Sequence, residues 1–260
     1  MSKFKNVLIT GASSGLGRAL AIELSKKSQN LFLCARNFEN LQETKNLCQN
    51  SNANIYLKIL DVKDEIASQN YINEIEENFA LDLIIVNAGI SGGTALGTES
   101  FVQIKEIFDT NLYGVLNIVQ PVIEKMVLRK NGQIAIISSL AGFVSLPSSP
   151  AYSASKSAVR IYGESLRVNL AQFGIKVNVV CPGYIKTPMT AVNNFYMPFL
   201  MNSDKASRKI ITGIEKNRGR IIFPIIFYVI IRILLALPFF LSEKIMKKLP
   251  KKSALKKYLT

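Results

Sequence analysis

The chain has 260 residues, of which 48% are hydrophobic, and this length suits one α/β domain with a large buried core. It contains no histidine, which excludes a Ser-His or Cys-His catalytic pair and any metal centre that needs imidazole. The three cysteines are scattered and form no CxxC pair, so we expect no structural zinc and a reducing, cytoplasmic environment.

The net charge of +14 is concentrated near the C-terminus. Residues 205–260 carry 14 Lys and Arg against 2 Asp and Glu, whereas residues 1–204 are almost balanced. The basic residues alternate with long apolar runs rather than with exposed aromatic residues. This pattern favours an anionic membrane surface over nucleic acid as a partner. A solvated, lysine-rich C-terminus is the alternative explanation.

Short apolar runs bounded by turn residues predict buried strands, and the stretches between them have helical periodicity. The predicted strands are 4–9, 30–35, 54–60, 81–86, 133–138 and 175–181, with a seventh at 220–223. Strands of this kind that alternate with helices form a doubly wound parallel sheet. We therefore expect a single-domain, Rossmann-like α/β fold over 1–224, with about seven strands and helices on both faces. An apolar, basic helical appendage is expected over 225–260.

A glycine-rich turn, TGASSGLG over residues 10–17, follows the first predicted strand and opens the first helix. Glycines permit a tight turn there and let backbone N–H groups approach a pyrophosphate at the helix N-terminus. The place of this turn between strand and helix predicts a dinucleotide site. Its candidate residues are Gly11, Ser13, Ser14, Gly15, Leu16 and Gly17.

Three later side chains have the spacing of an acid/base catalyst. Tyr152 and Lys156 are four residues apart on a predicted helix and so share a face, and Ser139 precedes Tyr152 by 13 residues. A free tyrosine has a pKa of about 10, which a neighbouring ammonium lowers toward neutrality. A serine hydroxyl can hydrogen-bond a substrate oxygen as charge develops on it. An exposed helix pair is the alternative for YxxxK taken alone.

Taken together and in order, these motifs resemble the short-chain dehydrogenase/reductase family over roughly residues 4–190. The resemblance implies that Tyr152 exchanges a proton with the substrate and that Ser139 positions the substrate oxygen. It implies that Lys156 lowers the tyrosine pKa and holds the nicotinamide ribose. Asn111 is similar to the family's catalytic asparagine, which holds a water in the proton relay; a structural, helix-kinking asparagine is the alternative.

The resemblance also implies cofactor contacts just after three other strands. The first group contacts the adenine ring, the second is the family's NAG motif, and the third closes over the nicotinamide carboxamide. Here these groups are Asp61 and Val62; Asn87, Ala88 and Gly89; and Pro182, Gly183, Ile185 and Thr187.

The cofactor preference depends on the end of the second strand. NAD-specific proteins of this fold carry an acidic residue there, which hydrogen-bonds the ribose hydroxyls. This chain has Arg36 instead, with no acidic residue between Glu23 and Glu39. A guanidinium pairs well with a 2′-phosphate, and Ser13 can add a hydrogen bond, so we expect NADP(H) rather than NAD(H). A surface arginine that only ends the strand is the alternative.

The expected substrate loop, about residues 184–203, is strongly apolar, and Lys186 is its only basic residue. Such a loop suits a small lipophilic alcohol or ketone and disfavours a highly anionic substrate. Ordinary core packing or a dimer contact would give the same pattern. The family resemblance implies a homodimer or homotetramer.

The apolar segment 225–241 is interrupted by Arg232 and Pro238. A spanning helix needs about 20 apolar residues, and a central arginine costs about 2.5–3.5 kcal/mol. We therefore predict an interfacial helix at the inner face of a membrane, followed by lysines directed toward anionic lipid. A buried helix over the substrate cleft is the alternative. The lysines are Lys244, Lys247, Lys248, Lys251 and Lys252.

The sequence thus predicts an NADP(H)-dependent oxidoreductase that moves a hydride between nicotinamide and a lipophilic alcohol or carbonyl. Two other hypotheses use the same fold, namely a non-catalytic dinucleotide sensor and a membrane-surface interaction protein. The sensor is disfavoured because all four catalytic positions hold competent residues. Hydride transfer to a ketone would separate the enzyme from both alternatives.

Overall fold

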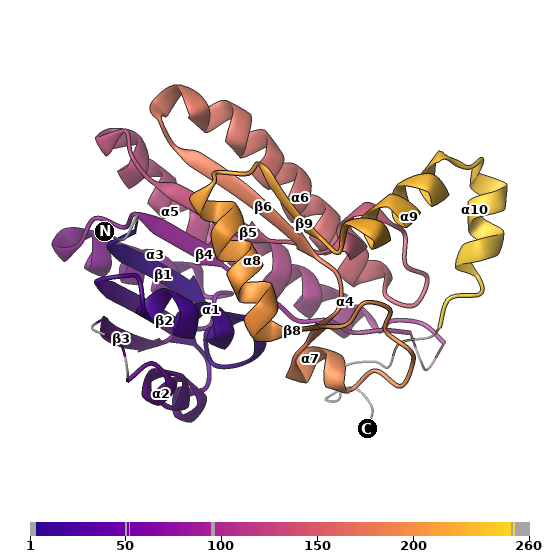
Figure 1. Ribbon diagram of the computed structural model, residues 1–260, viewed down its shortest axis with the longest axis horizontal. Helices are drawn as coiled ribbons and strands as arrows, with labels where there is room; N and C mark the ends of the chain where they lie inside the picture. Colours follow the sequence, from indigo (N-terminus) through magenta and orange to yellow (C-terminus); the bar gives the residue numbers. More distant parts are fainter. Residues whose placement is uncertain (1–3, 50, 52, 95–96, 251, 253–260) are drawn as a thin grey trace.

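A seven-stranded parallel sheet runs through the centre of the protein (Figure 1). The computed structural model describes residues 4–49, 51, 53–94, 97–250 and 252. The strands are β1 (Asn6–Thr10), β2 (Asn30–Ala35), β3 (Asn54–Ile59), β4 (Leu83–Val86), β5 (Gln133–Ile137), β6 (Lys176–Pro182) and β9 (Arg220–Phe223). Their order is β3-β2-β1-β4-β5-β6-β9, so the chain reverses direction across the sheet between β1 and β4. The expected Rossmann-like class with seven strands is confirmed.

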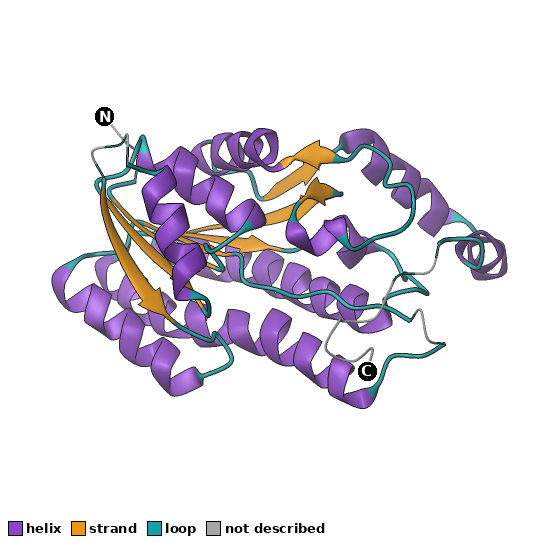
Figure 2. Cartoon of the chain, turned by 90° about the horizontal axis from the view of Figure 1, so that it is seen from below, coloured by secondary structure: helices purple, strands orange, loops and turns teal. Residues whose placement is uncertain are grey.

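Helices cover both faces of the sheet (Figure 2). In β1, Val7 and Ile9 pack toward one face and Leu8 toward the other, because successive side chains of a strand alternate. Two separate hydrophobic cores result, one on each face. The first is completed by α1 (Gly15–Ser25), α2 (Phe38–Leu47) and α8 (Ser203–Glu215), and the second by α3 (Glu65–Asn78), α5 (Gly114–Arg129) and α6 (Pro150–Leu170).

Side-chain caps set where several helices begin. Asn37 accepts a hydrogen bond from the backbone N–H of Asn40 at the start of α2. Ser100 does the same for Gln103 at the start of α4 (Phe101–Phe108). The helix α4 runs into α5 through a π-helical turn, η1 (Asp109–Tyr113).

The predicted substrate loop forms a small layer of its own beside the sheet. Its two short strands, β7 (Ile185–Lys186) and β8 (Met201–Asn202), pair in parallel, and α7 (Pro188–Ala191) lies between them. Two-residue strands have no periodicity, so the sequence did not predict them.

Two helices follow the last strand of the sheet and extend to one end of the molecule (Figure 1). They are α9 (Ile225–Ala236) and α10 (Phe239–Met246), and the break between them falls at Pro238, as predicted. Among the described residues, no helix is long and apolar enough to cross a membrane. Of the predicted lysine cluster, Lys251 lies outside the described residues, as do 253–260 of the appendage.

Candidate active site

A cleft of about 340 Å³ opens at the carboxyl ends of the parallel strands. This is where open α/β sheets bind their ligands, because the loops from neighbouring strands diverge at the point where the strand order reverses. Every residue predicted to contact the cofactor lines this cleft, and so does Ser139. Asn111 is the one predicted site residue that does not.

The glycine turn of the cleft has a shape that only glycines allow. Gly11 and Gly15 have φ values of +64° and +52°, where other residues are strained. A Cβ at Gly17 would lie 2.2 Å from the Gly11 carbonyl oxygen. Asn87 fixes this turn from behind, since its Nδ2 donates to the carbonyl oxygens of Thr10 and Gly11 at 3.0 and 3.2 Å. Bare backbone therefore faces the cleft, as a bound pyrophosphate requires.

The end of β2 presents a cation to the same cleft. Arg36 is exposed and lines the cleft, and within the described part of the chain its side chain makes no hydrogen bond or ion pair. Arg18, by contrast, is occupied: its Nη2 donates to the Ser13 carbonyl oxygen and to Glu43, both at 2.7 Å. The guanidinium available to a ligand here is therefore that of Arg36.

Asn111 lies behind the cleft wall, in the π-helical turn. Its Oδ1 accepts a hydrogen bond from Ile90 N at 2.8 Å, and its Nδ2 donates to Ile90 O at 2.9 Å and to Ser155 Oγ at 3.1 Å. A Cβ on Gly89 would lie 3.1 Å from Asn111 Oδ1. The side chain thus ties the loop after β4 to α6.

Ser139, Tyr152 and Lys156 meet at the wall of the cleft. Ser139 begins the short 3₁₀ helix η2 (Leu140–Phe143), where its Oγ accepts a hydrogen bond from Ala141 N at 3.1 Å. Tyr152 lies in the first turn of α6, and Lys156 lies one turn further along. The Lys156 Nζ is buried and donates to the Ile137 carbonyl oxygen at 2.9 Å.

Burial dominates the protonation of these groups. It raises the pKa of Tyr152, and the hydrogen bond with the Ser139 side chain partly opposes that rise. It lowers the pKa of Lys156 to about 8. The surroundings of Tyr152 therefore favour its phenol form over the phenolate.

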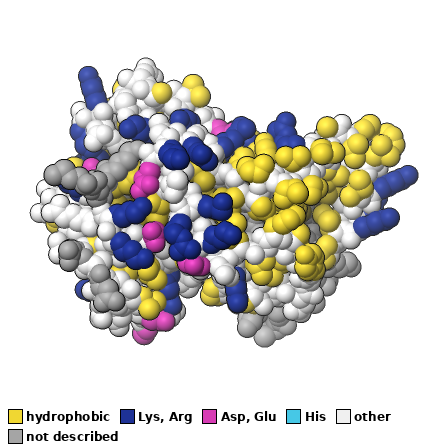
Figure 3. Space-filling model, viewed as in Figure 1, with side chains coloured by type: hydrophobic (Ala, Val, Ile, Leu, Met, Phe, Trp, Pro, Cys, Tyr) yellow, Lys and Arg dark blue, Asp and Glu magenta, His cyan; other side chains and the backbone are white. Residues whose placement is uncertain are grey.

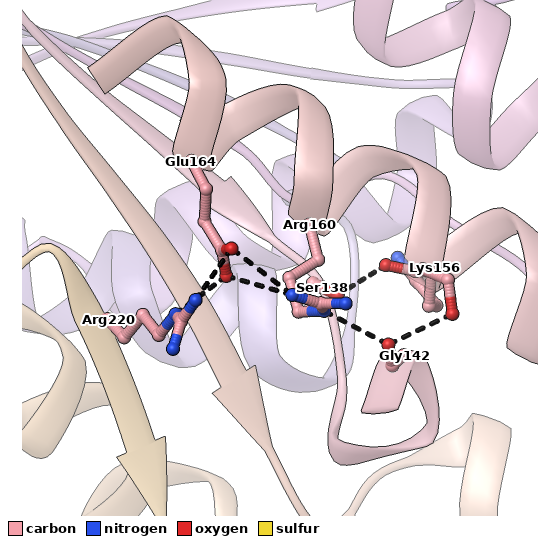
Figure 4. A network of polar contacts seen from close by, with 7 residues as sticks. Ser138, Gly142, Lys156, Arg160, Glu164 and Arg220 are labelled. Atoms are coloured by element: carbon pink, nitrogen blue, oxygen red, sulfur yellow. Dashed lines mark hydrogen bonds and ion pairs between the residues drawn. The ribbon is translucent and has the colours of Figure 1, made fainter. Parts of the chain in front are cut away.

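A polar network holds α6 in place behind these side chains (Figure 4). Ser138 Oγ donates to the Lys156 carbonyl oxygen at 2.7 Å, and Arg160 Nε donates to the Gly142 carbonyl oxygen at 3.0 Å. Further along α6, Glu164 accepts two hydrogen bonds from Arg220 of β9, both at 2.7 Å. The helix that carries Tyr152 is thus fixed to β5, to the loop after it and to the sheet edge.

Comparison with known proteins agrees with this geometry. A family model described as short chain dehydrogenase matches residues 5–195. The chain belongs to the short-chain dehydrogenase/reductase family. A relative from Myxococcus xanthus, described as an uncharacterized oxidoreductase, is 37% identical over 222 residues, which cover 85% of this chain and 88% of the relative.

Two solved structures of similar chains contain cofactors. A 3-oxoacyl-[acyl-carrier protein] reductase from Brucella melitensis with bound NAD is 26% identical, with a TM-score of 0.74 over 85% of this chain and 90% of that one. ElxO with NADP bound is 27% identical, with a TM-score of 0.73 over 84% and 97%. As a short-chain dehydrogenase/reductase, this protein is an oxidoreductase that uses a nicotinamide dinucleotide.

In this short-chain dehydrogenase/reductase, the predicted substrate loop and α9 form a cluster of aromatic rings. Tyr184 lies 6.2 Å from Phe195 and 6.1 Å from Phe227 of α9, measured between ring centroids. Phe199 lies 6.3 Å from Phe227. The substrate loop and α9 therefore share one apolar surface. The inner side of α9 also packs Ile231 against Leu140, next to Ser139.

The sequence analysis missed some residues of the cleft. Asn37 and Thr110 line it, and each is the chain neighbour of a predicted site residue, so adjacency was the available signal.

Lys252 was predicted to face lipid, and that prediction was wrong. The segment after α10 returns across the molecule, and Lys252 Nζ lies 5.3 Å from the centroid of the Tyr152 ring. No local sequence pattern signals a contact between residues 100 positions apart.

Proposed function

We propose that the protein interconverts a lipophilic alcohol and its carbonyl compound, with Tyr152 as general acid/base and NADP(H) as cofactor. The observation that carries this proposal is the meeting of Ser139, Tyr152 and Lys156 at the wall of a cleft that begins at the glycine turn. When bound, the nicotinamide supplies or accepts the hydride.

In the reductive direction, Tyr152 gives its phenolic proton to the carbonyl oxygen, and in the oxidative direction it takes the proton of the hydroxyl. Ser139 Oγ donates a hydrogen bond to the same oxygen as negative charge develops there. The Lys156 ammonium stabilises the phenolate and holds the ribose hydroxyls. Asn111 keeps the loop after β4 and α6 in register and holds a water that connects Lys156 to solvent.

Arg36 supports the preference for NADP(H), because its guanidinium faces the cleft and is free to pair with a 2′-phosphate. The other cofactor contacts are those predicted from the sequence. The adenine end is held by Asp61 and Val62, the pyrophosphate by the glycine turn, and the nicotinamide end by the segment from Pro182 to Thr187.

An apolar substrate is supported by the aromatic cluster of Tyr184, Phe195, Phe199 and Phe227. These rings belong to the substrate loop and to α9, and Tyr184 is close enough to Tyr152 to contribute to raising the pKa of Tyr152. A lipophilic tail lying against them would be removed from water, at a gain of about 25 cal/mol per Å².

We also propose that the protein acts at a membrane surface. The exposed apolar side of α9 and α10 supports this location. Hydrophobic side chains gather over this end of the molecule, with Lys and Arg at its edge (Figure 3). Ile225, Ile233 and Phe239 are 60%, 61% and 78% exposed. Such a patch exceeds what single scattered apolar residues produce. Within the appendage 225–260, α9 and α10 with Lys244, Lys247 and Lys248 are thus proposed to lie on anionic lipid beside the substrate loop, whereas Lys252 turns back to Tyr152.

A homodimer or homotetramer remains part of the proposal. It is supported by exposed apolar side chains on three helices, namely Phe101 of α4, Leu128 of α5 and Val168 of α6.

A substrate screen tests the proposed function directly. Hydrophobic aldehydes, ketones and alcohols are incubated with the protein and either NADPH or NADH, and the absorbance of the reduced nicotinamide is followed. We expect faster turnover with NADPH and with longer apolar chains. A protein that binds the dinucleotide and turns over none of these compounds would instead be the non-catalytic sensor.

A further inference from the structure

A lysine from the C-terminal segment lies against the proposed proton donor. The Lys252 Nζ is 5.3 Å from the centroid of the Tyr152 ring and donates a hydrogen bond to Ser91 Oγ at 2.5 Å. The backbone follows the same surface, since a Cβ on Gly93 would lie 2.4 Å from the Lys252 carbonyl oxygen. Lys252 therefore packs on the loop after β4, next to Tyr152.

The ammonium of Lys252 has been desolvated without gaining a counterion. Within the described part of the chain it forms no ion pair. Burial lowers its pKa to about 8, and the negative charge of Glu99 opposes this from a distance. The Glu99 carboxylate is itself occupied, because Oε2 accepts from Ala151 N at 2.9 Å. A buried cation without a carboxylate is costly, and such sites are normally completed by an anion.

We propose that Lys252 and Ser91 bind an anionic group of the substrate close to the reacting carbonyl. This inference rests on the proposed function and narrows its substrate class to amphiphilic oxo acids and hydroxy acids. Lys252 uses one N–H on Ser91 and keeps others free, and the Ser91 hydroxyl keeps its own proton. Both side chains lie beside Tyr152, where they can donate to the anionic group while the apolar part of the substrate lies on the aromatic cluster.

The lack of cations in the substrate loop does not oppose this class. Lys186 is the only basic residue of that loop, but Lys252 brings a positive charge to the same site from the other end of the chain. An ammonium that merely assisted the Tyr152 phenolate would speed every substrate alike. An ammonium that binds the substrate acts only on substrates that carry the complementary charge, and this difference can be measured.

The test compares acids with their methyl esters. The ten-carbon 2-oxo and 4-oxo acids and their esters are reduced with NADPH by the full-length wild type, Lys252→Met and Lys252→Arg. We expect Lys252→Met to lower kcat/KM for the acids about 10- to 100-fold, the effect of one charge-assisted hydrogen bond, and to leave the esters nearly unchanged. Lys252→Arg should restore most of the loss. Equal losses on acids and esters would overturn the proposal.

A matched control and a binding measurement complete the design. Lys176→Met removes an exposed lysine at the amino end of β6, away from the cleft at the carboxyl ends of the strands. This variant should leave kcat/KM unchanged for both the acids and the esters. Binding of decanoate and decanamide to wild type and Lys252→Met is measured by calorimetry, without any turnover. Decanoate binding that depends on Lys252 supports the anion site, whether or not a ketone is reduced. If no ketone is reduced, that result refutes the proposed function and leaves the anion site standing. Equal binding of both ligands to both proteins would refute the anion site.

Discussion

At the scale of single residues, the proposed chemistry depends on one proton. Tyr152 is the phenol that burial keeps protonated, and Ser139 and Lys156 are placed around it by the turn after β5 and by α6. The three side chains come from two segments that are joined by the network of Figure 4, so their relative positions do not depend on a mobile loop.

Tyr152→Phe removes the transferable proton and leaves the ring that packs in the site. We expect turnover to fall by about 10²- to 10⁴-fold, the range of a general acid/base, with the affinity for NADPH nearly unchanged. Steady-state rates and a fluorescence titration of NADPH measure the two effects. A variant that keeps more than about a tenth of wild-type activity would remove Tyr152 from its role.

The pH dependence should differ between the two directions of the reaction. Because burial raises the pKa of Tyr152, the group stays a phenol through neutral pH. Reduction needs the phenol and should stay level there, whereas oxidation needs the phenolate and should rise with pH. Lys156→Met removes the ammonium that stabilises the phenolate, so it should move the rise to higher pH. Profiles of kcat/KM in both directions test this, and an oxidation rate that does not change with pH would contradict it.

Arg36→Ala tests the cofactor preference. A charge-assisted pair with a 2′-phosphate contributes about 1.5–3 kcal/mol, so the variant should lose at least about tenfold in affinity for NADPH and almost nothing for NADH. Calorimetric titration of both cofactors gives the ratio. The neighbouring exposed residue Glu39 serves as a control, since Glu39→Gln should leave the ratio unchanged. An unaltered ratio in Arg36→Ala would place the 2′-phosphate elsewhere.

At the scale of elements, α9 shows how a helix can serve two surfaces. Ile231 packs on the loop after β5, and Phe227 stacks on Tyr184 of the substrate loop. The opposite side of the same helix is exposed. A compound dissolved in a bilayer that contacts this outer side would therefore lie one helix diameter, about 10 Å, from the aromatic cluster.

Co-sedimentation with vesicles tests the membrane proposal at this scale. The full-length protein should bind anionic vesicles at low salt, release at high salt and ignore neutral vesicles, since each lysine contributes on the order of 1 kcal/mol near an anionic surface. Replacing Ile226 and Ile230 of α9 by serine should weaken binding. Leu47 of α2 is 52% exposed, close to the 57% and 50% of Ile226 and Ile230, so Leu47→Ser is the control.

Two outcomes of this experiment would contradict the proposal. No binding to anionic vesicles at low salt would make α9 and α10 simply part of the fold. Resistance to both salt and alkaline carbonate would mean that the segment is inserted rather than adsorbed.

The elements themselves show what a sequence can and cannot predict. The strand Asn30–Ala35 has the predicted bounds because it is buried on both sides and bounded by turn residues. The strand β4 begins at Leu83, two residues later than predicted. The backbone of Asp82 still bonds both neighbouring strands, since its N–H donates to Asn6 O and its carbonyl oxygen accepts from Gln133 N, both at 2.9 Å, so the difference lies only in where the end of the strand is drawn. The π-helical turn at Asn111 has no signature of its own, because it differs from an α-helix only in its hydrogen bonds.

At the scale of the whole molecule, the candidate site could be predicted where its residues follow buried strands. Parallel strands end at one edge of the sheet, so any residue just after a strand lies at the cleft. That rule placed the glycine turn and Arg36, whereas the NAG segment came from the family resemblance. The same rule does not predict the position of Lys252, because this residue follows no strand. Lys252 comes close to Tyr152 only through the path of the chain after α10.

Because Lys252 reaches Tyr152 from the C-terminal segment, the site combines residues of the family motifs with a residue from outside them. The proton donor and the cofactor turn lie within the region 5–195 that the family model matches, whereas Lys252 lies outside it. Descendants of such a chain could exchange the tail and so present a different side chain to Tyr152, while every residue of the family motifs stayed the same. Substrate choice would then diverge among close relatives faster than their motifs do, and a classification built on motifs alone would group enzymes that act on different compounds.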